Sequence, residues 1–146
     1  MSANTPAHDV KLPTDEELVL KVIPMPRDVN VNGDIFGGWV MAQVDLAGAV
    51  TAAPHAHGRM ATVAVNEFIF KQPVRVGDVL SFFGKLVRIG RTSITVKIEV
   101  YAERIGAHGK YIKVTEASLT YVAIDELGKP REVPRPAGIT PPSTPS

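Results

Sequence analysis

One stretch of this sequence, residues 37–53, is the only good candidate for a helix, and it is apolar on every side. Alanine, valine, leucine, methionine and glycine surround its helical wheel, and Asp45 is its only charged residue. A helix with this pattern belongs in a core and not at a surface. Pro54 follows directly and predicts the end of the helix. One core helix needs other elements around it, so the remaining segments must supply a sheet.

Strand-like segments lie on both sides of this helix. One precedes it and four follow it, at residues 16–24, 60–73, 79–90, 92–104 and 111–125. Gly90-Arg91 marks a hairpin between the third and fourth of these segments. From Ile94 to Tyr101 apolar and polar residues alternate, which predicts a strand with one face in the core. Consecutive strands with short turns pair antiparallel. We therefore predict an α+β fold, a curved antiparallel β-sheet wrapped around one long central helix.

The composition predicts a single domain with two flexible ends. A chain of 146 residues has the size of one domain. Residues 1–15 are polar and contain two prolines, so we expect a flexible leader there. Residues 130–146 are rich in proline and serine and predict a flexible tail. The folded domain is expected over residues 16–129.

Charge and cysteine content exclude several classes of function. The net charge is +1, so no global field favours a nucleic-acid or membrane partner. The absence of cysteine excludes disulfides, thiolate zinc sites and cysteine nucleophiles. The N-terminal residues lack the apolar segment of a signal peptide, and no run approaches the ~18 apolar residues of a membrane span. These features favour a cytoplasmic protein.

Asp45 is the residue that most needs an explanation. Burying an unpaired, ionised carboxylate costs roughly several kcal/mol, so a core hardly tolerates one. It must therefore be hydrogen-bonded, be protonated or face a crevice. One interpretation is structural, with Asp45 binding a neighbouring backbone group. The other is functional, with Asp45 as a general base or nucleophile. Its neighbours three and four residues away carry no charge, which favours the crevice.

The segment before the helix contains turn formers and a glycine pair. Asn32-Gly33 predicts a turn, and Asp34 is placed to cap the helix. Gly37-Gly38 would then lie in the first helical turn, where backbone N–H groups are unpaired and carry partial positive charge. Such amides can bind an anion or polarise a carbonyl. The alternative is that the two glycines only let the helix approach the sheet.

Five segments carry a resemblance to a known family. They read MPRDVNVNGDIFGGWVMAQVDLAGAV, HGRMATVAV, KQPVRVGDVLSFFG, GRTSITVKIEVYAE and KVTEASLTYVAIDELGKPR. Over about residues 18–132 the sequence resembles the hotdog-fold acyl-CoA thioesterases, and among them the bacterial YciA-like branch. The combination of the helix-entry motif with the later GRTS is far more specific than either motif alone. The resemblance implies hydrolysis of acyl-CoA to a carboxylic acid and coenzyme A.

The resemblance also implies roles for individual residues. Asp45 takes the place of the catalytic acid, and Asn30 that of a functional loop asparagine. The helix start at Phe36, Gly37 and Gly38 would hold the thioester oxygen. The contact region for coenzyme A would comprise Arg91, Thr92 and Ser93. Beside these residues, Arg88 lies on the same hairpin and could add charge for the phosphates, and Asp34 is a second acid close to the helix start that could share catalysis if Asp45 does not act alone.

Assembly follows from the same resemblance. Subunits would pair through their sheets, with Asn30 and Asp45 of each site contributed by opposite chains. The dimers would assemble further as a trimer of dimers, giving a hexamer. The substrate supplies the coenzyme A, so no separate cofactor and no metal is expected. His55 and His57 are two residues apart just after the expected helix end, which is more typical of a plain loop than of a metal site.

Two other functions remain open on the same fold. A hydratase or dehydratase of acyl thioesters commonly uses a histidine base, and no histidine occurs between Asp9 and Pro54. A non-catalytic acyl-CoA-binding module could keep the pocket and lose the acid, whereas Asp45 and Asn30 are both present.

Overall fold

The computed structural model describes residues 10–107 and 109–135. Its elements are β1 (Glu17–Val22), a short 3₁₀ helix (Pro26–Asp28), α1 (Gly37–Ala56), β2 (Met60–Phe70), β3 (Val79–Ile89), β4 (Ser93–Glu103) and β5 (Ile112–Ala123). The five strands form one sheet in the order β1-β3-β4-β5-β2, and every neighbouring pair is antiparallel. The strands predicted from the sequence are all present, with ends that differ by a few residues.

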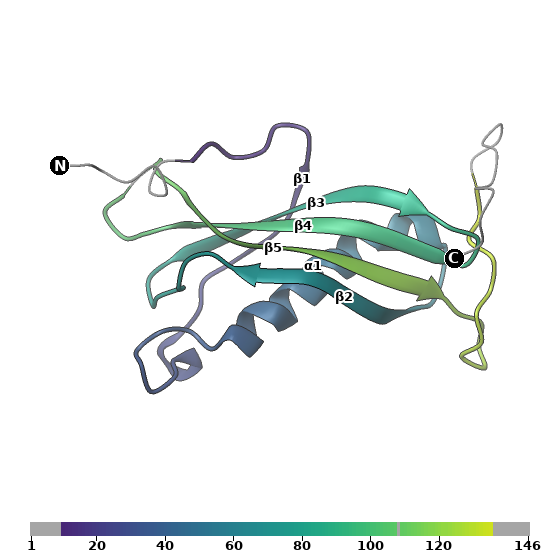
Figure 1. Cartoon of the computed structure of the whole chain (residues 1–146), viewed down its shortest axis with the longest axis horizontal. Helices are drawn as coiled ribbons and strands as arrows, with labels where there is room; N and C mark the ends of the chain where they lie inside the picture. Colours follow the sequence, from purple (N-terminus) through teal and green to yellow (C-terminus); the bar gives the residue numbers. More distant parts are fainter. Residues whose placement is uncertain (1–9, 108, 136–146) are drawn as a thin grey trace.

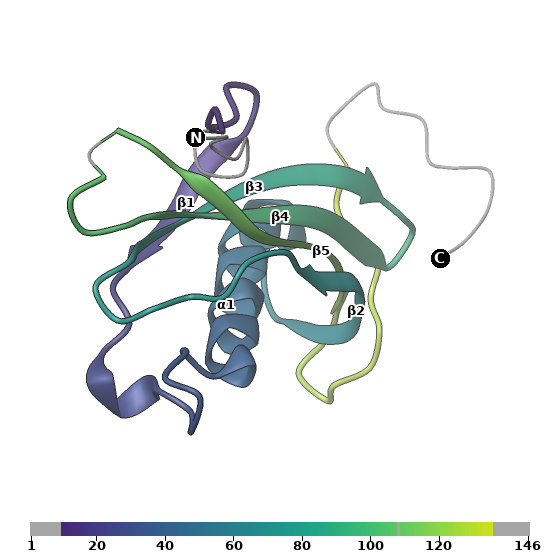
Figure 2. The same ribbon diagram turned by 60° about the vertical axis from the view of Figure 1, so that its left-hand side comes forward.

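The sheet curves around α1, which crosses its concave face (Figures 1 and 2). The alternating strand residues Ile94, Val96, Ile98 and Val100 are fully buried in the core. On the helix, the buried residues recur at the spacing of one helical face: Val40, Val44, Ala47, Gly48, Ala52 and Ala56. The predicted α+β architecture, one helix inside a curved antiparallel sheet, is confirmed.

The end of α1 differs from the prediction. The helix continues through Pro54 to Ala56, and His57 follows in the left-handed conformation with φ 52°. A proline removes one helical hydrogen bond and crowds the carbonyl four residues earlier. The helix ends two residues after Pro54, so the proline marks this end only to within two residues.

One side of α1 is not in the core of the single chain, contrary to the prediction of a fully buried helix. Leu46 and Val50, four residues apart and therefore on the same side of the helix, are 56% and 52% exposed. β2 is an edge strand that pairs only with β5 in the described sheet, and it exposes Val63 and Ile69 by more than half. An apolar helix side beside an apolar strand edge is a surface that natural proteins cover with another chain or element.

Both ends of the folded part touch the sheet. The N–H of Val10 donates to the carbonyl of Tyr111, and Asp15 pairs with Lys85 at 2.9 Å. At the other end the N–H of Val133 donates to the carbonyl of Arg91, and the side chain of Val133 is buried. The remaining residues of the expected leader and tail, 1–9 and 136–146, lie outside the described residues.

Candidate active site

The Asp45 carboxylate is turned toward the sheet and held there by two hydroxyl groups. Thr62 donates from Oγ1 to Asp45 Oδ1 at 2.9 Å, and the Tyr121 hydroxyl reaches the same oxygen at 2.9 Å. The Tyr121 hydroxyl also lies 2.8 Å from the backbone carbonyl oxygen of Asp45. Oδ2 receives no hydrogen bond from any described residue. One carboxylate oxygen is therefore anchored, and the other is available to a ligand or to water.

The two donors come from adjacent strands. Thr62 on β2 and Tyr121 on β5 are directly opposite each other in the strand register. Tyr121 is only 1% exposed, and burial, with the Asp45 carboxylate as a further cause, raises the pKa of its hydroxyl. The phenol is therefore protonated across the physiological range and acts as a donor. The sequence alone does not reveal these two donors, because Thr62 and Tyr121 lie 17 and 76 residues from Asp45 along the chain.

The start of α1 presents unpaired backbone amides. The helix begins at Gly37, and neither Gly37 nor Gly38 donates its N–H to another residue within the described ranges. The first helical N–H groups with acceptors are those of Trp39 and Val40, which donate to the carbonyl of Phe36. A Cβ added at Gly38 would meet nothing within 4 Å. These amides are therefore placed where they could reach a bound carbonyl oxygen.

Asp34 does not cap the helix, contrary to the prediction. The N-cap position is occupied by Phe36, which has no side-chain capping bond and an extended backbone with ψ 133°. The loop before α1 is stabilised by backbone bonds instead: the Phe36 N–H donates to the carbonyl of Asp28, and the Ile35 N–H to that of Val74. Because the helix starts later than a cap at Asp34 requires, the Asp34 side chain is left to line a neighbouring cavity.

Asn30 organises this loop through its side-chain oxygen. Its Oδ1 accepts hydrogen bonds from the N–H groups of Asn32 at 2.8 Å and Asp34 at 3.2 Å. The Asn30 backbone N–H donates to the carbonyl of Asp34 at 2.7 Å, which closes the turn. The side-chain NH₂ of Asn30 donates to no described residue. Asn30 is thus fixed by one end of its amide and retains two donor hydrogens at the other.

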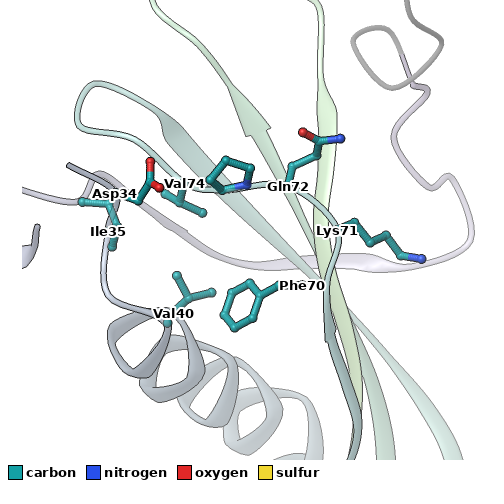
Figure 3. Close-up of a pocket in the computed structure, with 9 residues that line it drawn as sticks. Asp34, Ile35, Val40, Phe70, Lys71, Gln72 and Val74 are labelled. Carbon is teal, nitrogen blue, oxygen red and sulfur yellow. The ribbon is translucent and has the colours of Figure 1, made fainter. Parts of the chain in front are cut away.

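A cavity of about 360 Å³ lies beside the N-terminus of α1 (Figure 3). It is lined by Asp34, Ile35, Gly37, Val40, Phe70, Lys71, Gln72, Pro73 and Val74. Val40 and Phe70 face one another across it, whereas the Lys71 side chain points away. A Cβ at Gly37 would lie 3.2 Å from the Phe70 ring, so a larger residue at 37 would press on this wall. The helix amides therefore border a mainly apolar space.

The hairpin with the predicted coenzyme A residues lies at the other end of the helix. Gly90, Arg91 and Thr92 connect β3 to β4, and the Gly90 N–H donates to the carbonyl of Ser93. In Figure 1 this turn lies on the side of the C-terminal end of α1, away from the loop before the helix. Ile89 beside the turn shares a shallow cavity with His55 and His57 of the helix end.

The exposure of these hairpin residues differs. Arg88 and Arg91 are exposed, Thr92 is half-buried and Ser93 is buried. Arg91 faces Glu132 at 3.9 Å, and both side chains are mostly exposed, so this ion pair contributes little. Arg135 donates to the carbonyls of Ile89 and Gly90 and so links the C-terminal segment to this turn.

A single chain brings only some of the predicted site residues together. Phe36, Gly37 and Gly38 lie with Asp34 and Asn30 at one end of α1, and the hairpin lies at the other. Asp45 comes eight residues after Gly37, which is about 12 Å further along the helix axis at ~1.5 Å per residue. One chain therefore separates its carboxylate from its own helix-end amides.

Neither a metal-binding cluster nor a membrane-spanning helix is present among residues 10–107 and 109–135. The described part of the chain contains no group of three or more His, Cys, Asp or Glu side chains that could hold a metal ion. Among its helices none is long and apolar enough to cross a membrane.

Comparison with known proteins identifies the class to which this fold and site belong. The model of the thioesterase superfamily matches residues 32–107, more than half of the chain. The hexameric hotdog-fold thioesterase of Campylobacter jejuni is 40% identical, with a TM-score of 0.78 over 84% of this chain and 93% of that chain. The hexameric thioesterase of Yersinia pestis is 46% identical, with a TM-score of 0.78 over 86% and 100%.

Curated relatives agree with the solved structures. The acyl-CoA thioester hydrolase YciA of Salmonella typhimurium is 48% identical over 120 residues, which is 81% of this chain and 90% of the relative. YciA of Escherichia coli is 47% identical over 81% and 91%. The chain belongs to the thioesterase superfamily, and its fold is the hotdog fold, as the sequence resemblance implied.

Proposed function

We propose that this protein is an acyl-CoA thioesterase that hydrolyses acyl-CoA to a free carboxylic acid and coenzyme A. The observation that carries this proposal is the Asp45 carboxylate, anchored through Oδ1 and open at Oδ2, on a helix whose first amides are unpaired. Thioester hydrolysis needs these two elements, an activating carboxylate and donors for the developing oxyanion. The named activity of the YciA relatives supports the same reaction.

The site is proposed to form between two chains. Within one chain about 12 Å of helix separates Asp45 from Gly37, too far for both to act on one carbonyl. Two α1 helices related by a two-fold axis can place Asp45 of one chain beside the helix-end amides of the other. Asn30 lies in the loop next to those amides, so its free NH₂ would face the Asp45 carboxylate of the partner.

The exposed apolar surface is the proposed contact. It comprises the open edge of β2 with Val63 and Ile69, and the uncovered helix residues Leu46 and Val50. Pairing two β2 edges would join the sheets and bury this surface. We propose a dimer of this kind, and a trimer of such dimers, since the solved relatives from Yersinia pestis and Campylobacter jejuni are hexameric.

The proposed chemistry begins with the thioester carbonyl at the N-terminus of α1. The Gly37 and Gly38 amides donate to its oxygen, and one such donor typically supplies ~2.7–4 kcal/mol of transition-state stabilisation. As a general base, Asp45 takes a proton from water through Oδ2 while the water oxygen attacks the carbonyl carbon. The tetrahedral intermediate then collapses, the carbon–sulfur bond breaks, and the thiolate leaves and is protonated.

Direct attack by Asp45 is the other route. In that case the carboxylate forms a mixed anhydride with release of the thiol, and water then hydrolyses the anhydride. Both routes use the same open oxygen of Asp45. The Asn30 NH₂ would orient the attacking water in the first route and the carboxylate in the second.

The basic hairpin is proposed to hold the coenzyme A part of the substrate. Arg88 and Arg91 are exposed there and offer guanidinium groups to phosphates, beside Thr92 and Ser93. The acyl chain would then extend from the carbonyl into the apolar cavity that Val40 and Phe70 line.

A thiol-release assay tests this function. The wild-type protein is incubated with acyl-CoAs of increasing chain length, and free thiol is measured with a disulfide reagent. We expect release that saturates with substrate; no release from any acyl-CoA would refute the enzyme. A parallel measurement of absorbance loss from a 2-enoyl-CoA without release of thiol detects a hydratase, and saturable binding without either reaction would indicate a binding module.

A further inference from the structure

The contacts of Asp45 point to a residue that the reaction described above does not name. Tyr121 projects from near the C-terminal end of β5 to the helix, and its hydroxyl lies 2.9 Å from Asp45 Oδ1 and 2.8 Å from the Asp45 carbonyl oxygen. The Tyr121 side chain is among the largest fully buried side chains of the described residues. A buried phenol needs an acceptor, and here both acceptors belong to the same residue.

The helix is shaped to admit this hydroxyl. Gly48 lies three residues after Asp45 on the same side of α1. A Cβ at Gly48 would lie 2.3 Å from the Tyr121 hydroxyl oxygen and 3.2 Å from two ring carbons. Glycine in the middle of a helix is unfavourable compared with alanine. Its presence at 48 is explained by the space that the Tyr121 hydroxyl needs.

We infer that Tyr121 is a positioning residue for the Asp45 carboxylate and that Gly48 is the residue that lets it take this place. This inference rests on the proposed thioesterase function. By donating to Oδ1, Tyr121 fixes the rotation of the carboxylate so that Oδ2 faces the substrate side.

The tyrosine could serve the fold alone, and the test must separate these two roles. Tyr121→Phe keeps the ring in the core and removes only the hydroxyl. We expect kcat/KM for an acyl-CoA to fall about ten- to a hundredfold, the range of one hydrogen bond to a charged group. We also expect Tyr121→Phe to add little to the loss in an Asp45→Asn background, because the hydroxyl then has no catalytic carboxylate to position.

Gly48→Ala gives an independent route to the same effect, since the added methyl group displaces the hydroxyl without removing it. In the Tyr121→Phe background the methyl group no longer meets a hydroxyl, so Gly48→Ala should add much less to the loss than it causes alone. Tyr101→Phe is the matched control. Tyr101 contacts Phe83 and Lys113 rather than Asp45, and its variant should keep wild-type kinetics.

The results distinguish the inference from the function on which it rests. An inactive wild type would refute the thioesterase itself. An active wild type in which Tyr121→Phe costs as much in the Asp45→Asn background as alone, and in which Tyr121→Phe and Gly48→Ala are additive, would refute the positioning role and leave the thioesterase intact. Thermal unfolding of each variant detects a loss of fold, which by itself would lower activity equally in both backgrounds.

Discussion

The two-chain origin of the active site can be tested by mixing two inactive variants. Asp45→Asn removes the carboxylate but keeps a side-chain oxygen for Thr62 and Tyr121. Asn30→Asp keeps the oxygen that binds the Asn32 and Asp34 amides and removes the NH₂ group. Each variant alone should be nearly inactive, and each should keep its local structure because the acceptor oxygen is preserved.

The expected recovery follows from the geometry. Since about 12 Å of helix separates Asp45 from the helix start, a site takes Asp45 from one chain and Asn30 from the other. In a dimer with one chain of each variant, one site combines the intact Asp45 with the intact Asn30, and the second site carries both changes. Random pairing at equal expression makes about half of the dimers mixed, so about a quarter of all sites are intact.

The assay is thiol release from co-expressed and co-purified chains. We expect about a quarter of the wild-type rate per chain, well above either variant. The control is co-expression of Asp45→Asn with a chain that carries both substitutions, in which no pairing restores a site. Recovery no greater than the mean of the two separate variants would refute the composite site and place Asn30 and Asp45 in one chain.

Three further predictions concern the assembly, the core and pH. Leu46→Lys charges the exposed apolar side of α1 and should shift the protein to smaller species in size-exclusion chromatography. Leu127 is also exposed but lies outside the proposed contact, so Leu127→Lys should elute like the wild type. Identical elution of the two variants would contradict the proposed contact. Gly84→Ala places a Cβ 2.0 Å from Thr51 Oγ1 and should lower the free energy of unfolding in urea by ~1–3 kcal/mol, with partial recovery when Thr51→Ala is added; no change would show that the strand can shift. Burial and the Asp45 carboxylate raise the pKa of Tyr121, so as the pH rises past ~10 the unfolded chain loses the phenol proton before the folded chain does. The free energy of unfolding should therefore fall less steeply above this pH in Tyr121→Phe than in the wild type. Equal slopes would contradict the contact between Tyr121 and Asp45.

Much of the fold could be predicted because its signals are local. The alternation from Ile94 to Tyr101 and the single apolar stretch after Gly37 determine strand and helix by their periods. Periodicity does not say whether an apolar side packs against the same chain or another one, so the exposure of Leu46 was not foreseen. Pro54 predicts the helix end only to within two residues, because a proline weakens the helix at its own position without stopping the turn that contains it.

The site residues also fall into those with a local signal in the sequence and those without one. Asp45 stands out in the sequence because a charge in an apolar helix demands a partner or a solvent-facing role. Its partners Thr62 and Tyr121 come from strands distant in sequence, and only the sheet register brings them together. Gly48 was the one available signal, since a glycine in mid-helix indicates close approach by another group. The predicted Asp34 cap failed because backbone bonds of the loop start the helix at Gly37, two residues later than such a cap requires.

The central claim is that the Asp45 carboxylate activates the attack on the thioester, and one rate comparison tests it most directly. The measurement is kcat/KM for thiol release by the wild type and by Asp45→Asn with the best acyl-CoA substrate, at matched thermal stability and oligomeric state. The account predicts a loss of about 10²- to 10⁴-fold, the usual contribution of a positioned acid–base group. Wild-type activity in Asp45→Asn would contradict it and would move the chemistry to another acid, with Asp34 the first to examine.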